Sequence, residues 1–306
     1  MKIATFNLRN LFAPGIRDEY GTPFEITRAF VDRYSDELRT VIEKLDADIL
    51  IVEEVGSQQE LEHILLRMGG VDAGYKVFFA EADSRGICVA VIYRVSLEPC
   101  SLPDVDGMPV LRTGEEDVLG KIIGNYRGLL YAKGVYNTKS LHIFGMHLKA
   151  NNNLPLKGRD GKHIVPVSQR DAGDGVIRTL YLKLAEARRV RELVDAVFAE
   201  EADAQIILLG DMNDVDGSHV LRIISGVKDD PSTQLLNATL QFTKEEKFSH
   251  YYKGKGLLID HILISTSLTA HVESVEIRNS ELVDQTEMCE ADILASDHAP
   301  VLLTLQ

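Results

Sequence analysis

The sequence predicts a mixed α/β fold built from two similar layers. Two apolar runs, at residues 48–55 and 205–214, each follow a predicted helix and finish on carboxylates, which is typical of buried strands that end at a polar site. Shorter runs at hairpin spacing predict antiparallel strands beside them. Because no linker, fixed-period repeat or low-complexity tract divides the chain, residues 1–306 are expected to form a single domain.

The first half of the chain begins with a short strand that ends on Asn7 and leads into a polar loop. Apolar residues from Tyr34 to Leu45 then recur at helical spacing, with Asp32 or Ser35 as the candidate N-cap. The run 103–124 is polar and rich in Gly and Pro, which predicts a surface loop. The other predicted elements of this half are a helix over 58–68 and strands over 48–55, 75–80, 86–94 and 97–102.

The second half opens with a predicted hairpin of two strands, 129–136 and 140–147, about Asn137 and Thr138. The long polar segment 149–175 follows, and segments of this length are usually functional or disordered. The remaining predicted elements are a helix over 180–198, the strand at 205–214, a short helix from Ser218 to Ile224 ended by Gly226, and strands over 257–264, 272–277 and 301–305.

The composition is that of an ordinary globular protein, with 45% hydrophobic and 26% charged residues. The formal net charge of -14 counts against tight, sequence-independent binding of nucleic acid, although a bound cation can reverse the sign at one site. Three cysteines at no metal-ligand spacing predict no disulfide framework. With no signal peptide and no apolar run of membrane-spanning length, a cytoplasmic location is expected, and secretion after removal of a signal is the alternative.

Polar residues recur at the ends of the predicted strands, where ligands bind in open α/β sheets. Carboxylate and amide oxygens without thiolates suit a hard cation such as Mg²⁺, and imidazoles suit proton transfer or contact with phosphate oxygens. Each residue alone also fits a turn or a satisfied strand end, so the interpretation depends on their joint occurrence. Together they favour metal-assisted hydrolysis of a phosphoester. These strand-end polar residues are Asn7, Glu54, His147, Asp211, Asn213, Asp260, Asp297 and His298.

Six short motifs occur in order between residues 5 and 301. They are Thr5-Phe6-Asn7, the run from Asp48 to Glu54-Val55, Met146-His147-Leu148-Lys149, Gly210-Asp211-Met212-Asn213-Asp214, Ile259-Asp260-His261-Ile262-Leu263 and Ser296-Asp297-His298-Ala299-Pro300. In this order they resemble the endonuclease/exonuclease/phosphatase superfamily, which shares the deoxyribonuclease-I-like fold, and above all its bacterial nuclease-type members. The resemblance implies a four-layer α/β/β/α sandwich with two central mixed, mainly antiparallel sheets and a site at the top of those sheets.

The resemblance also implies a metal site. By its place in the motifs, Glu54 is similar to the family's principal metal ligand, with Asn7 beside it as a ligand or a neighbour of a ligand. Asp297 is expected to share the ion. The implied ion is Mg²⁺, with Mn²⁺ as a substitute.

The remaining motif residues are similar to the hydrolytic groups of the family. Asp211 corresponds to the aspartate that orients or activates the attacking water, and Asn213 to its phosphate-binding neighbour. His298, steadied by Asp260, corresponds to a general base or to a contact of the transition-state phosphate. His147 resembles the histidine that binds the scissile phosphate.

Three positions depart from the family pattern or add to it. Glu53 stands where the family commonly has Gln, and alternation along the strand predicts Glu54 inward and Glu53 outward. His261 is expected to be packed or hydrogen-bonded rather than a ligand. Arg127 is a candidate for substrate contact, although a single arginine at a strand start is usually a solvated cation.

The predicted function is divalent-metal-dependent phosphodiester hydrolysis, with nucleic acid as the expected substrate and no obligate protein partner evident. The alternative is a phosphatase or phosphodiesterase for a small or lipid phosphoester of the inositol phosphate or sphingomyelin type, because one fold hosts many activities. A more remote alternative is a non-catalytic scaffold protein with the same fold. The presence of all eight strand-end residues argues against it.

Overall fold

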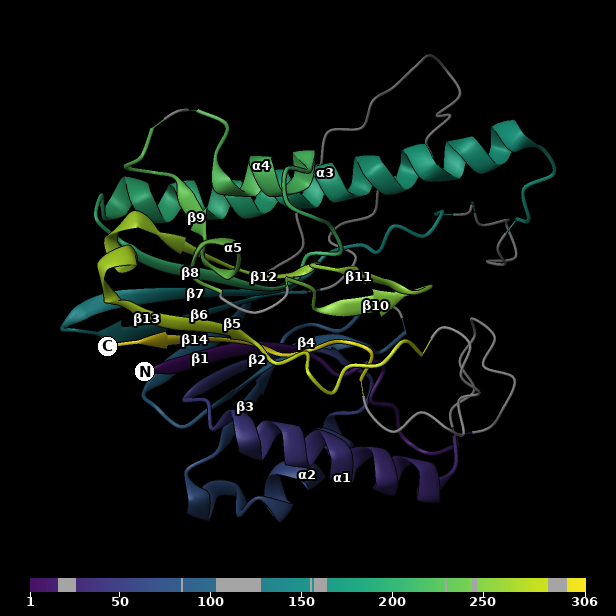
Figure 1. The fold of residues 1–306 in the computed structure, drawn as a ribbon, viewed down its shortest axis with the longest axis horizontal. Helices are drawn as coiled ribbons and strands as arrows, with labels where there is room; N and C mark the ends of the chain where they lie inside the picture. The colour runs from purple at the N-terminus through teal and green to yellow at the C-terminus, as the bar shows by residue number, and fades with distance from the viewer. Residues whose placement is uncertain are drawn as a thin grey trace.

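The computed structural model of the chain describes residues 1–15, 26–83, 85–102, 128–154, 156, 164–228, 230–243, 247–285 and 296–306. Within these ranges the strands form two six-stranded sheets and a two-stranded hairpin. The two sheets lie face to face (Figure 1). Helices α1 (Arg28–Leu45) and α2 (Gln58–Arg67) cover one outer face, and α3 (Gln169–Glu200) and α4 (His219–Ser225) cover the other. The predicted four-layer α/β/β/α sandwich is confirmed.

The first sheet places strands from the two ends of the described chain side by side. Its strands, in order across the sheet, are β13 (Val272–Ile277), β14 (Val301–Leu305), β1 (Lys2–Asn7), β2 (Ile49–Val55), β4 (Cys88–Tyr93) and β3 (Lys76–Phe79). Strands β1 and β14 are antiparallel, with Lys2 opposite Thr304. Strands β1 and β2 are parallel, so that Asn7 and Glu53 reach the same edge of the sheet together.

The second sheet carries the stretch that the sequence marked as a buried strand with a polar end. Its strands, in order, are β5 (Leu97–Leu102), β6 (Leu129–Tyr136), β7 (Lys139–His147), β8 (Gln205–Asp211), β12 (Asp260–Ser265) and β9 (Leu235–Asn237). The predicted hairpin joins β6 and β7, and its turn residues Asn137 and Thr138 have φ values of 47° and 65°. Strands β7 and β8 are parallel, whereas β8 and β12 are antiparallel.

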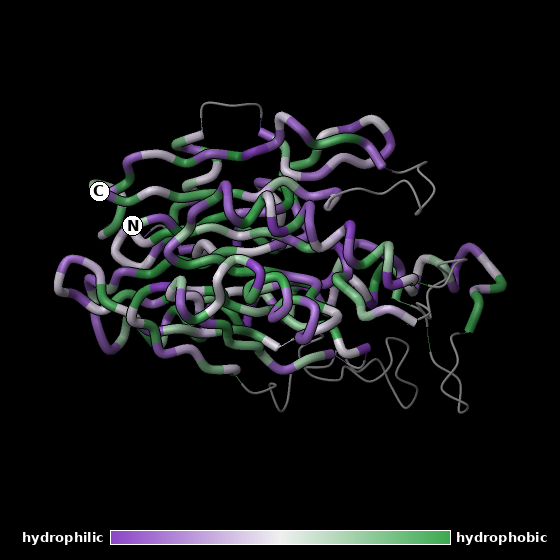
Figure 2. Tube along the Cα trace, turned by 90° about the horizontal axis from the view of Figure 1, so that it is seen from below, coloured by the Kyte–Doolittle hydropathy of each residue, from purple (hydrophilic) through white to green (hydrophobic). Residues whose placement is uncertain are grey.

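Alternation along the central strands separates the apolar side chains into layers. On β2, Ile49 and Ile51 join the core between the sheets, whereas Leu50 and Val52 join the core under α1 and α2. A third apolar cluster packs α3 and α4 against the second sheet. Figure 2, which looks along the direction in which the layers stack, shows hydrophobic segments along the strands in the middle of the molecule. Full burial of one such side chain stabilises the fold by roughly 1.5–3 kcal/mol.

The start of α1 differs from the expectation. Its N-cap is Thr27, whose side-chain oxygen accepts a hydrogen bond from the Phe30 backbone N–H, and not Asp32 or Ser35. The first turn of the helix precedes its first buried residue, Val31, so the apolar periodicity begins only after the helix has started.

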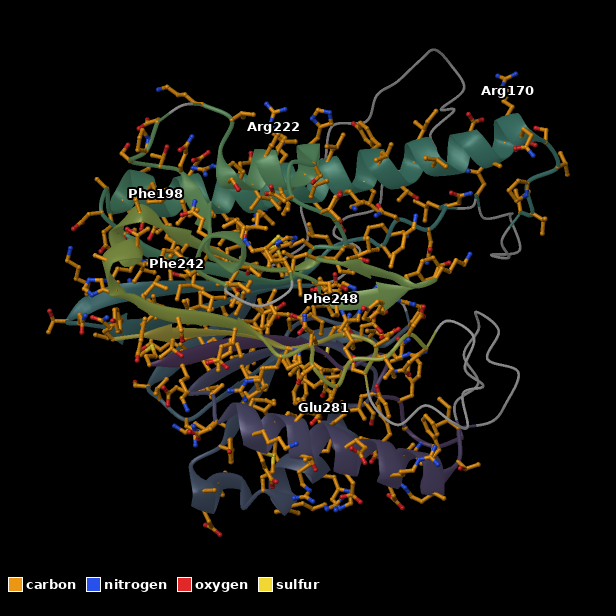
Figure 3. All side chains as sticks on the ribbon, viewed as in Figure 1. Arg170, Phe198, Arg222, Phe242, Phe248 and Glu281 are labelled. Carbon is orange, nitrogen blue, oxygen red and sulfur yellow. The ribbon has the colours of Figure 1, made fainter. Side chains whose placement is uncertain are left out.

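Helix α3 is longer than its apolar stripe predicted. Ser168 caps it by accepting a hydrogen bond from the Asp171 backbone N–H, so the last residues of the segment 149–175 are helical rather than loop. Figure 3 shows Arg170 at one end of α3, well beyond the sheets, and Phe198 at the other. The residues that these first turns bury, Gly175, Arg178 and Thr179, have no large apolar side chain, so they leave no apolar stripe in the sequence.

Several short elements were not predicted, because three to six residues carry little periodicity. They are β9 (Leu235–Asn237), β10 (His250–Tyr252), β11 (Lys255–Leu257), α5 (Ala238–Phe242) and the 3₁₀ turns Gly70–Ala73 and Thr266–His271. Strand β12 begins at Asp260, so this carboxylate lies at a strand start rather than inside a strand. The predicted loop 103–124 and Arg127 lie outside the described residues. None of the described helices is long and apolar enough to cross a membrane.

Gly210 allows β8 to approach β7 closely at the point where the polar residues begin. Its φ is +144°, and a Cβ atom built there would lie 1.9 Å from the Met146 carbonyl oxygen on β7. A side chain therefore cannot be placed without moving the backbone of one of the two parallel strands. Glycine at this position is a requirement of the sheet.

We expect Gly210→Ala to lower the free energy of unfolding by about 3 kcal/mol or more, because the new methyl group meets a backbone carbonyl of the neighbouring strand. Gly173→Ala on α3, where nothing lies within 4 Å of the added Cβ, should raise it by roughly 0.5–1 kcal/mol. Urea denaturation measures both variants. A Gly210→Ala protein as stable as the wild type would contradict the close approach.

Candidate active site

Three strands of the second sheet end together in a row of polar residues. His147 ends β7 opposite Asp211, which ends β8, and Asp211 lies opposite Asp260 at the start of β12. The row forms because β12 is antiparallel to the other two strands, so that its first residue meets their last ones. All three residues are buried. The structure thus brings together three residues that the sequence marked separately.

Asp211 receives hydrogen bonds from amides of both sheets. Its Oδ2 accepts from Asn7 Nδ2 at 3.0 Å and from Asn213 Nδ2 at 3.1 Å, and its Oδ1 accepts from the Asn213 backbone N–H at 2.8 Å. Burial and then the charge of Asp260 raise the pKa of Asp211 to about 7, although His298 and the Asn213 N–H lower it. This carboxyl group can therefore exchange a proton near neutral pH.

The turn after β8 is fixed by a buried lysine. Asn213 has a φ of 51°, and its side-chain amide also donates to the Leu148 carbonyl at 3.1 Å. From α3, Lys183 Nζ donates to the Asn213 carbonyl at 2.7 Å, to Asp214 Oδ2 at 2.9 Å and to Asn151 Oδ1 at 2.8 Å. The sequence interpretation missed Lys183, although its position on the apolar face of a helix was an available signal.

His298 is oriented by Asp260. The distance from His298 Nδ1 to Asp260 Oδ2 is 2.8 Å, and Ser249 Oγ donates to the same oxygen at 2.6 Å. His298 Nε2 then lies 3.9 Å from Asp211 Oδ2. Burial lowers the pKa of His298, but Asp260, with Asp211 and Asp297, outweighs it and raises that pKa well above its ordinary value.

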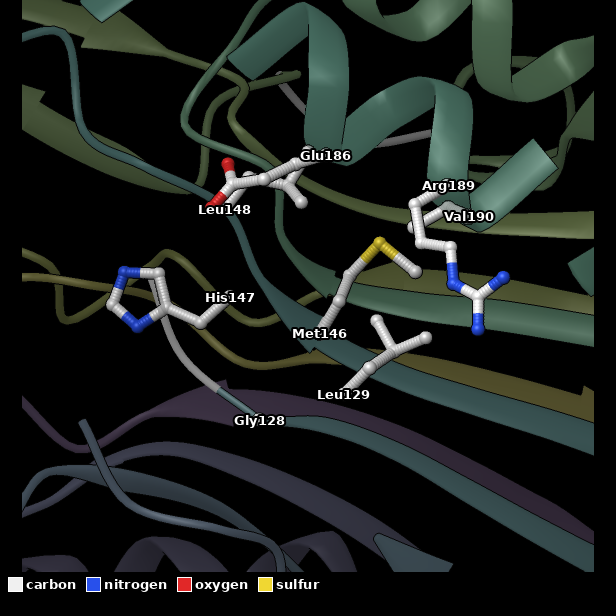
Figure 4. Close-up of a pocket in the computed structure, with 8 residues that line it drawn as sticks. All are labelled: Gly128, Leu129, Met146, His147, Leu148, Glu186, Arg189 and Val190. Carbon is white, nitrogen blue, oxygen red and sulfur yellow. The ribbon is translucent and has the colours of Figure 1, made fainter. Parts of the chain in front are cut away.

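His147 lies between two carboxylates. Its Nε2 is 3.4 Å from Asp211 Oδ2 and 3.7 Å from Glu54 Oε1. The His147 side chain is 1% exposed and the Glu54 side chain 18% exposed, so Glu54 is the member of this group that solvent reaches. A small pocket between the end of β7 and α3 is also lined by His147, together with Glu186 and Arg189 (Figure 4).

The predicted orientation of the two consecutive glutamates is wrong for Glu53. Glu53 is fully buried, continues the inward face of Ile49 and Ile51, and its Oε1 accepts a hydrogen bond from Thr5 Oγ1 at 2.5 Å. Glu54 reaches the rim instead through a left-handed φ of 58° and a bulge in the pairing of β2 with β4. Burial raises the pKa of Glu53 well above its ordinary value.

Asp297 lies beside two residues that the sequence interpretation missed. Its Oδ2 is 3.4 Å from Arg9 Nε and 3.7 Å from His250 Nε2. Burial raises the pKa of Asp297, but His250, His298 and Arg9 together lower it well below its ordinary value. His250 belongs to a strand of three residues, which is too short to be recognised by pattern.

His261 takes the structural role that was expected for it. It is buried, its Nε2 lies 2.9 Å from the Asp214 carbonyl oxygen, and its Nδ1 lies 3.1 Å from Asn237 Nδ2. The ring therefore fixes the turn after β8 from the side of β12, opposite to Lys183. It has no part in the polar row.

The oxygen donors at the rim have the chemistry that a hard cation requires. Glu54 and Asp297 are partly exposed carboxylates, and among the described residues Glu54 pairs with no lysine or arginine. Asn7 faces the same region, where its amide donates to Asp211 and its Oδ1 accepts from the Arg9 backbone N–H at 2.8 Å. The structure therefore places two of the three expected ligands at the rim and gives Asn7 protein partners.

Comparison with known proteins gives a family model over nearly the whole chain. The model described as the Endonuclease/Exonuclease/phosphatase family matches residues 4–298. No curated protein sequence matches the chain. The resemblance to this family that the sequence indicated is thus confirmed.

Solved structures with the same fold cover the chain from end to end. A mannosyl-6-phosphatase of Bacteroides thetaiotaomicron is 16% identical, with a TM-score of 0.59 over 100% of this chain and 99% of that one. A 3′ phosphatase from Neisseria, bound to a product DNA hairpin, is 16% identical, with a TM-score of 0.54 over 100% and 99%. An AP endonuclease from Archaeoglobus fulgidus is 14% identical, with a TM-score of 0.55 over 100% and 99%.

We expect the His298 imidazole to titrate above its ordinary pKa in chelator-treated protein, because Asp260 stabilises the charged ring. Asp260→Asn should move the midpoint down by at least about one pH unit. Imidazole ¹⁵N shifts measured against pH report both values. The pKa of His298 is raised in the folded state, so its pairing with Asp260 stabilises the fold fully at pH values below the unfolded-state pKa of about 6.5. This stabilisation is lost as the pH rises through the folded-state pKa of His298. Equal midpoints in the two proteins would contradict the pairing.

Lys183→Met should lower the free energy of unfolding by roughly 3–5 kcal/mol, because it leaves the Asp214 carboxylate without its buried partner. Arg188→Met, on the same helix, removes only an exposed ion pair with Glu192 and should cost less than about 1 kcal/mol. Thermal and urea unfolding of both variants provide the measurement. Similar losses in the two variants would show that Lys183 does not hold the turn.

Proposed function

The chain belongs to the Endonuclease/Exonuclease/phosphatase family, and from this premise we propose that it hydrolyses phosphodiester bonds with a divalent metal ion. The observation that carries the proposal is the convergence of Asn7, His147 and His298 on the carboxylate of Asp211. A carboxylate held between amides and two imidazoles is suited to orient a water molecule for attack on phosphorus.

Each residue of the cluster has a role that follows from its contacts. Asp211, held by Asn7 and Asn213, orients and deprotonates the attacking water. His298 presents Nε2 toward the phosphate because Asp260 holds Nδ1. Nε2 of His147, which faces both carboxylates, contacts a non-bridging phosphate oxygen.

A bound ion completes the proposed site. Glu54 and Asp297 would hold Mg²⁺, or Mn²⁺ in its place, with Asn7 beside them. When bound, the ion polarises the phosphoryl oxygens and offsets their negative charge. The protein keeps the two carboxylates fixed at the rim through the bulge at Glu54 and the ion pair of Arg9 with Asp297.

Nucleic acid is the proposed substrate class, supported by the shared fold of a Neisseria phosphatase bound to DNA and of an archaeal AP endonuclease. A small phosphoester is the second candidate. The net charge of -14, which repels long polyanions, and the fold shared with a mannosyl-6-phosphatase favour it. The two candidates use the same residues and differ in what lies around the phosphate.

A substrate panel tests the proposal and separates the candidates. Purified protein is assayed with Mg²⁺ or Mn²⁺, with and without chelator, against plasmid DNA, RNA, an artificial phosphodiester, inositol phosphates and sugar phosphates. Metal-dependent cleavage of DNA or RNA supports the nuclease. Intact nucleic acid alongside cleavage of a small phosphomonoester would overturn it in favour of the second candidate. No hydrolysis of any substrate would favour a scaffold.

Glu54→Gln should lower kcat/KM for the cleaved substrate by roughly 100-fold or more, because the charge that holds the ion is lost. Glu273→Gln, at an exposed position of β13, is the matched control and should keep wild-type activity. Initial rates at saturating Mg²⁺ measure both variants. Full activity in Glu54→Gln would remove this residue from the metal site.

A further inference from the structure

His250 places a second imidazole against the reaction centre. It pairs with His298 in an isolated antiparallel bridge, and the two rings lie 4.6 Å apart between centroids. The facing ligand atoms of His250, Asp297 and His298 all lie within 4.8 Å of one another. The three side chains, from β10 and from the segment before β14, form a compact triangle that shares Asp297 with the predicted Mg²⁺ site.

The distance between His250 and Asp297 suits a shared ion better than a hydrogen bond. The separation of 3.7 Å between Nε2 and Oδ2 is too long for a hydrogen bond. Two ligands on one tetrahedral zinc ion lie roughly 3.3 Å apart, given zinc bonds of about 2.0–2.1 Å. A shift of a few tenths of an ångström would therefore bring both atoms to bonding distance.

The protein contacts leave ligand atoms available on both rings. Asp260 occupies Nδ1 of His298, so that Nε2 is the nitrogen left to bind. This carboxylate–histidine arrangement is the one that orients metal-binding histidines in proteins. His250 Nδ1 is buried and makes no hydrogen bond among the described residues, and the polar neighbour of its Nε2 is Asp297, the carboxylate that would share the ion.

We propose that His250, Asp297 and His298 form a site for Zn²⁺, with a water molecule as the fourth ligand. Two imidazoles and one carboxylate are a typical zinc set, whereas Mg²⁺ prefers oxygen donors alone. The ion displaces the proton from Nε2 of His298 and shares Asp297 with Arg9, which lies 3.4 Å from the same oxygen.

The consequence for activity rests on the proposed function. Zinc bound here occupies the Nε2 atom of His298 that faces the phosphate and takes Asp297 from the Mg²⁺ site. Zn²⁺ therefore inhibits Mg²⁺-dependent hydrolysis. His250 contributes to the zinc site alone, so its loss removes the inhibition and leaves the hydrolytic residues in place.

Zinc binding to chelator-treated protein is the primary test, and it needs no substrate. Titration calorimetry with Zn²⁺ is compared between the wild type, His250→Gln and the control His219→Gln, which changes an exposed histidine at the start of α4. Co²⁺ absorption reports nitrogen ligation and tetrahedral geometry in the same three proteins. We expect His250→Gln to weaken zinc binding by roughly 100-fold and His219→Gln to leave it unchanged. Equal affinities in all three proteins would overturn the site.

Inhibition is the second test. With Mg²⁺ in excess, micromolar Zn²⁺ should inhibit the wild type and the His219→Gln control, whereas His250→Gln should keep its activity. Inhibition that persists undiminished in His250→Gln would overturn the assigned consequence. If the protein hydrolyses no phosphoester, the proposed function fails, and the calorimetric comparison still decides whether His250 builds the zinc site.

Discussion

The carboxylate of Asp211 is buried where the two sheets meet, and the surrounding structure is arranged to keep it there. An unpaired charge in such a place costs several kcal/mol, so each oxygen must be hydrogen-bonded. Asn7 supplies one bond from the first sheet and Asn213 supplies two from the turn after β8. Asp211 therefore has all of these hydrogen-bond donors only when the two sheets are packed against each other.

The geometry of β8 follows from this requirement. Gly210 lets the strand pass against the Met146 carbonyl, and the chain then turns sharply so that Asn213 folds back onto Asp211. Lys183 from α3 and His261 from β12 fix this turn from two sides. The outer helix layer thus acts on the polar cluster through the buried ammonium group of Lys183, although no residue of α3 joins the polar row.

Most of the fold and most of the cluster could be predicted from sequence, because both depend on strands with strong apolar signals and polar ends. The row of His147, Asp211 and Asp260 is a product of strand register, which alternation constrains well. Glu53 follows the alternation of Ile49 and Ile51 to the inward face, whereas the rim position of Glu54 could not be predicted, because it depends on a one-residue bulge and a left-handed φ. The position of His250 could not be predicted, because its strand has only three residues and is held by contacts with residues distant in the sequence, such as His298.

The two ends of the described chain share the site, and this has a consequence for biosynthesis. Asn7 bonds to a residue 204 positions later, Ser296 Oγ donates to the Asn7 carbonyl, and β14 lies against β1. A ribosome must therefore release residues beyond 298 before the cluster can close around Asp211. A nascent chain that has not emerged as far as residue 298 holds an incomplete cluster, which lacks the hydroxyl of Ser296 and the ring of His298.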